Sequence, residues 1–236
     1  MSAEINPPLK IIARIHSDFP EKFGIPRQSG LAPDTISIIV FEEEYRNAES
    51  LRGIEGFDYL WLIWEFSENV RENWSPTVRP PRFGGNTRLG VFATRSPFRP
   101  NPIGLSSVRL LRVEHDPEFG LILVISGADL MDGTPIYDIK PYLPYTDAHP
   151  DAAGGFAHEA DKILTVHFPE NLLNQIPEKY RTGLIQVLSQ DPRPSYQADG
   201  ERVYGVYYAD YNVRFSVMDG VLTVCDVEKR KLLNEE

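Results

Sequence analysis

Hydrophobic and polar residues alternate along most of the first two-thirds of the chain, and this period of two predicts β-strands. The expected strands are short, rich in Val and Ile, and separated by Gly, Pro, Asn or Asp. They cover residues 9–15, 35–41, 57–66, 89–94, 105–113, 120–126 and 163–168, with a short helix over 45–51. Long amphipathic helices do not alternate with these strands, so no Rossmann-type parallel sheet is expected. A closed or nearly closed β-barrel protects the edges of this many short strands best.

The hydrophobic pattern changes after residue 169. Apolar residues from Leu172 to Leu188 recur at helical spacing, and Pro177 interrupts them. Three strands at 202–208, 212–217 and 221–227 follow, with a tight turn at Asp219-Gly220 before the last. We therefore predict a mainly β protein, with a barrel domain over residues 1–169 and a small α+β domain over residues 170–236.

Positive charge is concentrated in one segment. Residues 73–112 contain seven arginines and no Lys, Asp or Glu, whereas the whole chain carries a net charge of −10, which leaves about −17 for the rest. Six prolines stiffen this arginine segment. Guanidinium groups on a stiff backbone recognise phosphates, carboxylates and nucleobases with defined geometry. The segment therefore predicts an anion-binding site, toward which an acidic body would direct polyanions.

Several classes of protein and site are not expected. The chain has no run of eighteen apolar residues that would span a membrane and no secretory signal at its N-terminus. Its single cysteine, Cys225, excludes internal disulfides and thiolate zinc clusters, fits a reducing cytoplasm, and lies in an alternating run that predicts burial. The dinucleotide, P-loop and nucleophile-elbow motifs are absent, and the five histidines form no metal-type cluster.

Three motifs carry candidate chemistry. Arg27 and Gln28 follow the rigid Pro26 and predict either a ligand-binding loop or a solvated surface turn. The proline-rich stretch 94–104 combines stiffness with several hydrogen-bond donors and predicts a ligand role. In an extended chain Asp138, Lys140 and Tyr142 would share one face with Ile136, which suits either acid–base work or a salt-bridged strand surface.

Taken together, the motifs resemble the TsaA-like family, known as the TrmO tRNA methyltransferases. The matching stretches are KFGIPRQSGL, RPPRFGGN, GVFATRSPFRPNPIGLS, DGTPIYDIKPYLPY and SQDPRP, in that order, followed by NVRF. The resemblance implies a β-barrel enzyme that works as a homodimer in the cytoplasm and uses S-adenosylmethionine. It implies methylation at N6 of N6-threonylcarbamoyladenosine, at position 37 beside the anticodon of tRNA, with the small C-terminal domain contacting the tRNA.

The resemblance also implies roles for particular residues. Cofactor contacts would come from Pro26, Arg27, Gln28, Ser67, Glu68, Arg95, Leu105, Ser126, Gly127, Ala128 and Asp129. Related sequences have a His-Gln pair where this chain has Ser67-Glu68. Asp129 or Asp138 would accept the proton of N6, with Lys140 and Tyr142 orienting the base. Substrate contacts would come from Arg82, Arg88, Arg99, Asn101 and Arg193.

Two other functions also fit the residues. The arginine segment suits an RNA-binding module without catalysis, and it equally suits an enzyme that acts on a small anionic metabolite. The order and spacing of the motifs favour the methyltransferase.

Overall fold

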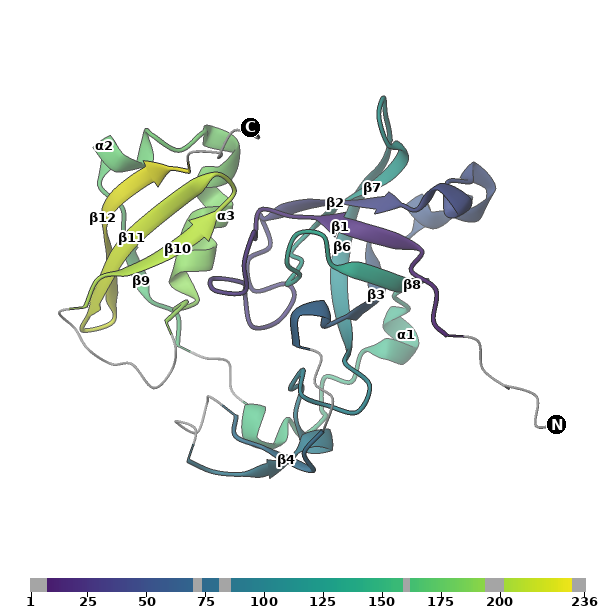
Figure 1. Ribbon diagram of the computed structural model, residues 1–236, viewed down its shortest axis with the longest axis horizontal. Helices are drawn as coiled ribbons and strands as arrows, with labels where there is room; N and C mark the ends of the chain where they lie inside the picture. The colour runs from purple at the N-terminus through teal and green to yellow at the C-terminus, as the bar shows by residue number, and fades with distance from the viewer. Residues whose placement is uncertain (1–7, 70–73, 81–85, 159–161, 194–201, 231–236) are drawn as a thin grey trace, which may run out of the picture.

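A computed structural model of the protein describes residues 8–69, 74–80, 86–158, 162–193 and 202–230. Most of its regular structure is β, gathered in two units that lie side by side in Figure 1. The expectation of a mainly β protein without a Rossmann-type sheet is therefore confirmed. Short helices of the 3-10 type cover 43–45, 48–51, 54–56, 67–69, 91–93 and 155–157.

The N-terminal unit is a ring of six antiparallel strands. They are β1 (Ala13–His16), β2 (Ile36–Phe41), β3 (Tyr59–Glu65), β6 (Ile103–Asp116), β7 (Gly120–Ser126) and β8 (Pro135–Pro141), paired in the order β1-β2-β7-β6-β3-β8. β8 pairs back to β1 at Ala13 and Arg14, so each strand has two neighbours. Alternate residues point into the ring and form a hydrophobic core that includes Ile15, Leu62 and Leu123. The alternation seen in the sequence is the cause of this packing.

β8 departs from the expected alternation at Tyr137. Its register against β3 shifts between Ile63, which lies opposite Asp138, and Trp64, which lies opposite Ile136. The extra residue turns Ile136 into the core, where it is fully buried. The prediction that Ile136 shares a face with Asp138 is therefore wrong, because a strict period of two does not survive a bulge.

The C-terminal unit is a four-stranded sheet covered by helices (Figure 1). The sheet comprises β9 (Thr165–His167), β10 (Tyr204–Tyr208), β11 (Tyr211–Met218) and β12 (Val221–Lys229), in the order β10-β11-β12-β9. The helices are α2 (Glu170–Leu173) and α3 (Glu178–Ser189), separated at Pro177 as predicted. β9 pairs with β12, so this strand, which the alternation attributes to the first domain, belongs to the second sheet.

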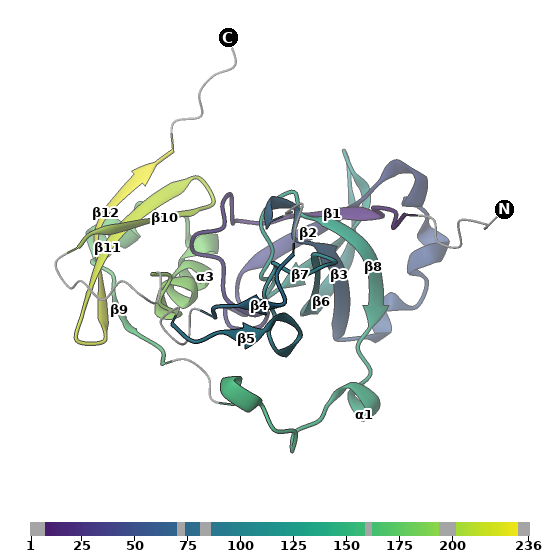
Figure 2. The same cartoon turned by 60° about the horizontal axis from the view of Figure 1, so that its bottom comes forward.

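The long loop between β1 and β2, residues 17–35, packs its apolar side chains against the C-terminal unit, although its main chain also bonds to the ring. Phe19 and Ala32 are buried in the C-terminal hydrophobic core. The Asp34 main-chain N–H donates to Gln186 on α3 (2.9 Å), and the Gln186 amide donates back to the Asp34 carboxylate (2.7 Å). Both views show this loop reaching from β1 toward α3 (Figure 2). The loop therefore connects the strand ring, into which its two ends continue, to the hydrophobic core of the C-terminal unit.

Three local predictions need correction or refinement. The stretch 89–94 is strand only at β5 (Leu89–Gly90), which pairs with β4 (Thr77–Val78), before a 3-10 turn begins. Residues 45–51 form 3-10 turns rather than one helix, and a short helix, α1 (Pro144–Asp147), follows β8. Cys225 is exposed, because it lies on the outer face of β12 after the buried Leu222 and Val224, and is the extra residue where the register against β11 shifts.

Candidate active site

A chain of hydrogen bonds inside the end of the ring holds one carboxylate in place. The Trp64 indole N–H on β3 donates to Ser106 Oγ on β6 (2.9 Å), and the Ser106 hydroxyl donates to Asp129 Oδ1 (2.6 Å). Gly104 makes room for this arrangement, because a Cβ there would lie 2.3 Å from the Trp64 ring. Two neighbouring strands therefore fix the position of Asp129, which itself follows β7.

The surroundings of Asp129 favour its neutral form. Burial raises the pKa of Asp129 above its ordinary value, while the Ser106 hydroxyl, the Ser29 main chain and the charge of Arg95 oppose the shift. A partly desolvated carboxylate beside a guanidinium can accept a proton or bind a cationic group. Such a perturbed carboxylate at the end of the strand ring is typical of a functional site.

Arg95 and Gln28 meet beside this carboxylate. The Arg95 guanidinium donates to the Gln28 side-chain oxygen, which joins the arginine segment to the loop 17–35. The same loop contacts the corner after β7 through the main chain, where Gly30 N–H donates to Gly127 O (2.8 Å) and Gly127 N–H donates to Thr35 O (3.0 Å). The structure thus brings together the predicted cofactor residues of three separate motifs, including the buried corner Ser126, Gly127 and Ala128.

The other predicted cofactor residues differ in their placement. Lys22 Nζ donates to the main-chain oxygen of Glu68 (2.7 Å), which brings the turn at Ser67 and Glu68 against the loop 17–35. The Leu105 side chain is 57% exposed and lies on the opposite face of β6 from Ser106. Its neighbour Ser106, rather than Leu105 itself, points toward Asp129.

Asp138, Lys140 and Tyr142 lie together but apart from Asp129. Lys140 Nζ forms an ion pair with Asp138 (2.8 Å), and this contact raises the pKa of Lys140. The Tyr142 ring packs against Trp61 on the outer face of β3, with ring centroids 5.6 Å apart. These three residues face outward, whereas Asp129 bonds to the inward-facing Ser106. One chain therefore does not bring the four predicted catalytic residues into a single cluster.

The predicted substrate residues fall into two groups. Arg88 donates to Thr77 Oγ1 (3.4 Å), Arg99 donates to the Thr94 carbonyl (3.3 Å), and Asn101 is exposed. Arg193 instead forms two 2.8 Å hydrogen bonds with Asp191 at the end of α3, and its side chain is 15% exposed. Arg82 lies outside the described residues.

Asp191 connects the C-terminal unit to the candidate site. Burial would raise its pKa, but the hydrogen bonds and charge of Arg193 and the charge of Arg27 outweigh this and lower it. Residues 22–27 line a small hollow at this junction, together with Val187, Gln190, Asp191 and Pro192. The SQDPRP motif therefore braces the junction beside the loop that carries Arg27 and Gln28.

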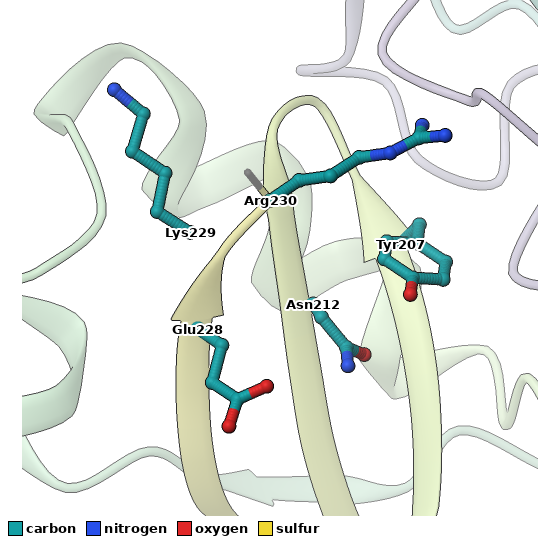
Figure 3. A pocket seen from close by; sticks show the side chains of 5 residues that line it. All are labelled: Tyr207, Asn212, Glu228, Lys229 and Arg230. Atoms are coloured by element: carbon teal, nitrogen blue, oxygen red, sulfur yellow. The ribbon is translucent and has the colours of Figure 1, made fainter. Parts of the chain in front are cut away.

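A second hollow, on the C-terminal sheet, has no comparable chemistry (Figure 3). Its lining residues are Tyr207, Asn212, Glu228, Lys229 and Arg230, and Arg230 lies over the Tyr207 ring at 5.6 Å. Lys229 and Glu228 point in different directions, so no set of donors converges on a ligand. Among the described residues no group of His, Cys, Asp and Glu is arranged to hold a metal, and no helix has the length and apolarity to span a membrane.

The sequence analysis did not predict Trp64 and Ser106 as site residues, although the position of Ser106 in its strand is unusual. It occupies an inward position of β6 between Gly104 and Val108, where an apolar residue is expected. A buried hydroxyl needs a partner, and here the partner is Asp129.

The two halves of the chain match one protein family. Residues 14–148 match the tRNA-methyltransferase O N-terminal domain, and residues 161–230 match the TrmO C-terminal domain. The chain belongs to the tRNA-methyltransferase O family.

Relatives and solved structures extend this result. A tRNA (adenine(37)-N6)-methyltransferase of Escherichia coli (strain K12) is 42% identical over 228 residues, which are 93% of this chain and 97% of the relative. A Pseudomonas aeruginosa protein, 42% identical over 212 residues (86% of this chain and 90% of that protein), carries "S-adenosylmethionine-dependent methyltransferase" in its name. A crystal structure of TrmO from P. aeruginosa superposes with a TM-score of 0.78 at 34% identity, over 97% of this chain and 100% of that one.

Proposed function

We propose that the protein transfers the methyl group of S-adenosylmethionine to N6 of adenine 37 in tRNA, and that N6-threonylcarbamoyladenosine is the substrate. The family, and the relatives named for methylation of adenine 37, support the reaction. The single structural observation that carries the proposal is the meeting of Arg95, Gln28 and Asp129 at one end of the strand ring. We propose that this ring acts as a closed barrel, since each of its strands has two neighbours.

The residues at this end suit the methyl donor, whose sulfonium supplies an electrophilic methyl carbon. The Arg95 guanidinium matches a carboxylate, and the partly desolvated carboxylate of Asp129 matches an ammonium or sulfonium. The loop Pro26, Arg27 and Gln28 would close over one side. Ser126, Gly127 and Ala128 would contribute main chain at the floor, and the turn Ser67-Glu68, with Leu105, would complete the rim.

The residues of the chain contribute mainly by positioning. Holding the acceptor nitrogen in line with the methyl carbon supplies effective molarities of about 10⁵ M or more in favourable cases. Asp129 would take the proton that N6 must lose, since its raised pKa makes it a better acceptor than an ordinary aspartate. The charge of Arg95 beside it opposes this transfer, because it lowers the pKa of Asp129, and burial favours it.

Asp138, Lys140 and Tyr142 would act in a homodimer. They face outward on β8, and in a single chain they do not contact the Asp129 cluster. A second copy would present them to the modified base held by the first. Replacing Asp138 with Asn should then lower turnover while leaving donor affinity unchanged; unaltered turnover would remove Asp138 from the mechanism. Sedimentation of the purified protein tests the dimer.

The arginine segment would bind the tRNA backbone. Among the described residues, Arg88, Arg95 and Arg99 form no ion pair with a carboxylate, so their charges are available to phosphates and to the threonyl carboxylate. Asn101 would add a contact, as would Arg82. Arg193 would act indirectly, through its brace to Asp191. We also propose that residues 1–169 and 170–236 act as separate domains, the second aiding tRNA binding, and that the protein works in the cytoplasm.

Mass spectrometry of nucleosides tests the proposal. tRNA that lacks the methyl mark is incubated with protein and isotopically labelled S-adenosylmethionine, in parallel with tRNA that lacks the threonylcarbamoyl group. We expect one labelled methyl group on the hypermodified adenosine and none on the unmodified one. Methylation of both would overturn the substrate assignment. RNA binding without heat of donor binding would favour a simple RNA-binding module, and failure of tRNA to compete for donor turnover would favour a metabolite enzyme.

A further inference from the structure

We propose that Trp74 and Phe92 form a stacking platform for a base of the anticodon loop, next to the adenine that is methylated; this inference rests on the proposed function. The two rings stack on each other with centroids 6.2 Å apart and an interplanar angle of 30°. Trp74 is 53% exposed and Phe92 is 73% exposed. Two large aromatic side chains that contact each other and stay open to solvent present an apolar surface that packing in a core does not explain.

The main chain around β4 and β5 holds the platform in place. Val91 N–H donates to the Pro76 carbonyl (3.0 Å), and Thr77 pairs with Gly90 in the two-stranded β4–β5 hairpin. These bonds fix the chain two residues after Trp74 against the residue before Phe92. The hairpin stands away from the strand ring in Figure 1, so the platform projects from the ring.

The platform is surrounded by positive charge. Residues 74–112 contain no acidic residue, and Arg79 and Arg88 lie within the same short hairpin. Among the described residues, neither of these arginines forms an ion pair with a carboxylate. Proteins that bind single-stranded nucleic acid combine aromatic rings with guanidinium groups. The bases stack on the rings, and the phosphates pair with the cations.

The distance to the candidate active site fits a neighbouring nucleotide. Arg95 is three positions after Phe92, so their Cα atoms are at most about 11 Å apart. Arg95 in turn contacts Gln28 and lies beside Asp129. A base on Phe92 therefore belongs to the same loop as the methyl acceptor, within a few nucleotides of it.

A loop of RNA fits this surface better than a second protein copy does. The cores of protein–protein interfaces are depleted of charged residues, because buried charges lose their hydration. Here the arginines that flank the rings would be buried without carboxylate partners from their own hairpin. Phosphates of an anticodon loop supply those partners without any rearrangement of the hairpin.

Binding of an anticodon stem-loop RNA to the full-length protein tests the platform. Trp74→Ala and Phe92→Ala should each weaken binding about ten- to hundredfold, whereas Trp74→Phe, which keeps a stacking ring, should stay near wild type. Stacking does not release counterions, so the slope of log affinity against log salt should not change in these variants. Arg88→Ala should reduce that slope by about one. Tyr145→Ala, at an 86% exposed tyrosine on α1, is the matched control and should bind normally.

A loop RNA with one base removed identifies the stacked nucleotide. At that position Trp74→Ala should cause no further loss, because the stacking partner is already absent. Wild-type affinity in both alanine variants overturns the inference, and so does a changed salt slope. If these variants convert a dimer to a monomer, and if cross-linking the dimer restores RNA affinity, the rings form a protein interface and the inference is wrong. If the wild-type protein binds a stem-loop that carries N6-threonylcarbamoyladenosine but does not methylate it, the proposed function fails while the platform stands.

Discussion

Replacing Gly24 with alanine tests whether the C-terminal unit holds the loop of the candidate site. Gly24 has φ +95°, a conformation that favours glycine, and a Cβ added there would lie 2.1 Å from Val206 Cγ2 on β10. Gly24 is two residues before Pro26 and four before Gln28, which contacts Arg95. Alanine at position 24 therefore pushes the loop off the sheet at the point where the two units meet.

Two separate costs set the magnitude. A side chain at positive φ costs about 1–2 kcal/mol. Forcing one more methyl group into a packed contact costs typically about 1–3 kcal/mol. The free energy of unfolding should therefore fall by roughly 2–5 kcal/mol if the loop stays docked. If the loop undocks instead, the fraction of binding-competent protein falls, and the apparent Kd for S-adenosylmethionine rises by the same factor.

Urea denaturation and donor calorimetry distinguish these outcomes. Gly53→Ala is the matched control, because Gly53 has φ +89° but nothing within 4 Å of an added Cβ. It should show only the backbone cost. Val206→Ala removes the clashing methyl and leaves Cβ 3.6 Å away, so it should partly rescue Gly24→Ala in a double-mutant cycle. Equal stability and equal donor affinity for Gly24→Ala and Gly53→Ala would refute the docking argument.

Three further changes probe the charges and packing. Asp129→Asn should lower single-turnover methyl transfer by about 10²–10⁴-fold, and wild-type turnover would exclude it as proton acceptor. Burial raises the pKa of Asp18 to about 6, so wild-type stability should fall as pH rises from about 4 to 6, by at most about 3 kcal/mol. Urea titrations of Asp18→Asn should lack this slope, and parallel pH curves would contradict the reasoning. Gly104→Ala should displace Trp64 from Ser106 and lower the melting temperature; an unchanged calorimetric transition would show that the ring can move aside.

The strands of the ring were predictable because one face of each is buried. In β1, the buried Ala13 and Ile15 alternate with the exposed Arg14 and His16, and this pattern is present in the sequence. The break at Pro177 was predictable for a local reason too, since proline cannot continue a helix. The arginine segment could be identified from amino-acid composition alone, because residues 73–112 contain seven arginines and no acidic residue. These features depend only on residues that are near one another in the chain.

The remaining features depend on contacts between distant residues. No local sequence pattern predicts that the loop 17–35 packs on a sheet formed by residues 204–229. Nor does one predict that Ser106 bonds to Asp129. The bulge at Tyr137 shifts the register of β8 by one residue, which misplaced Ile136. Cys225 was misplaced because both faces of its run are apolar, and only the structure shows that Leu222 and Val224 face the core. The site residues came from recognised motifs, but their separation into an inner and an outer group required the structure.

The loop 17–35 makes the C-terminal unit part of the candidate site. Its two ends continue into β1 and β2 of the ring, while Phe19 and Ala32 are buried in the other core. The Asp18 carbonyl accepts from Ala209 N–H (2.7 Å), which ties the start of the loop to the turn after β10. A ligand that binds Gln28 and Arg95 therefore selects the docked loop, and by linkage it stabilises the contact between the units. The affinity for S-adenosylmethionine and the stability of the contact between the two units should therefore change in the same direction, because the loop 17–35 contributes to both.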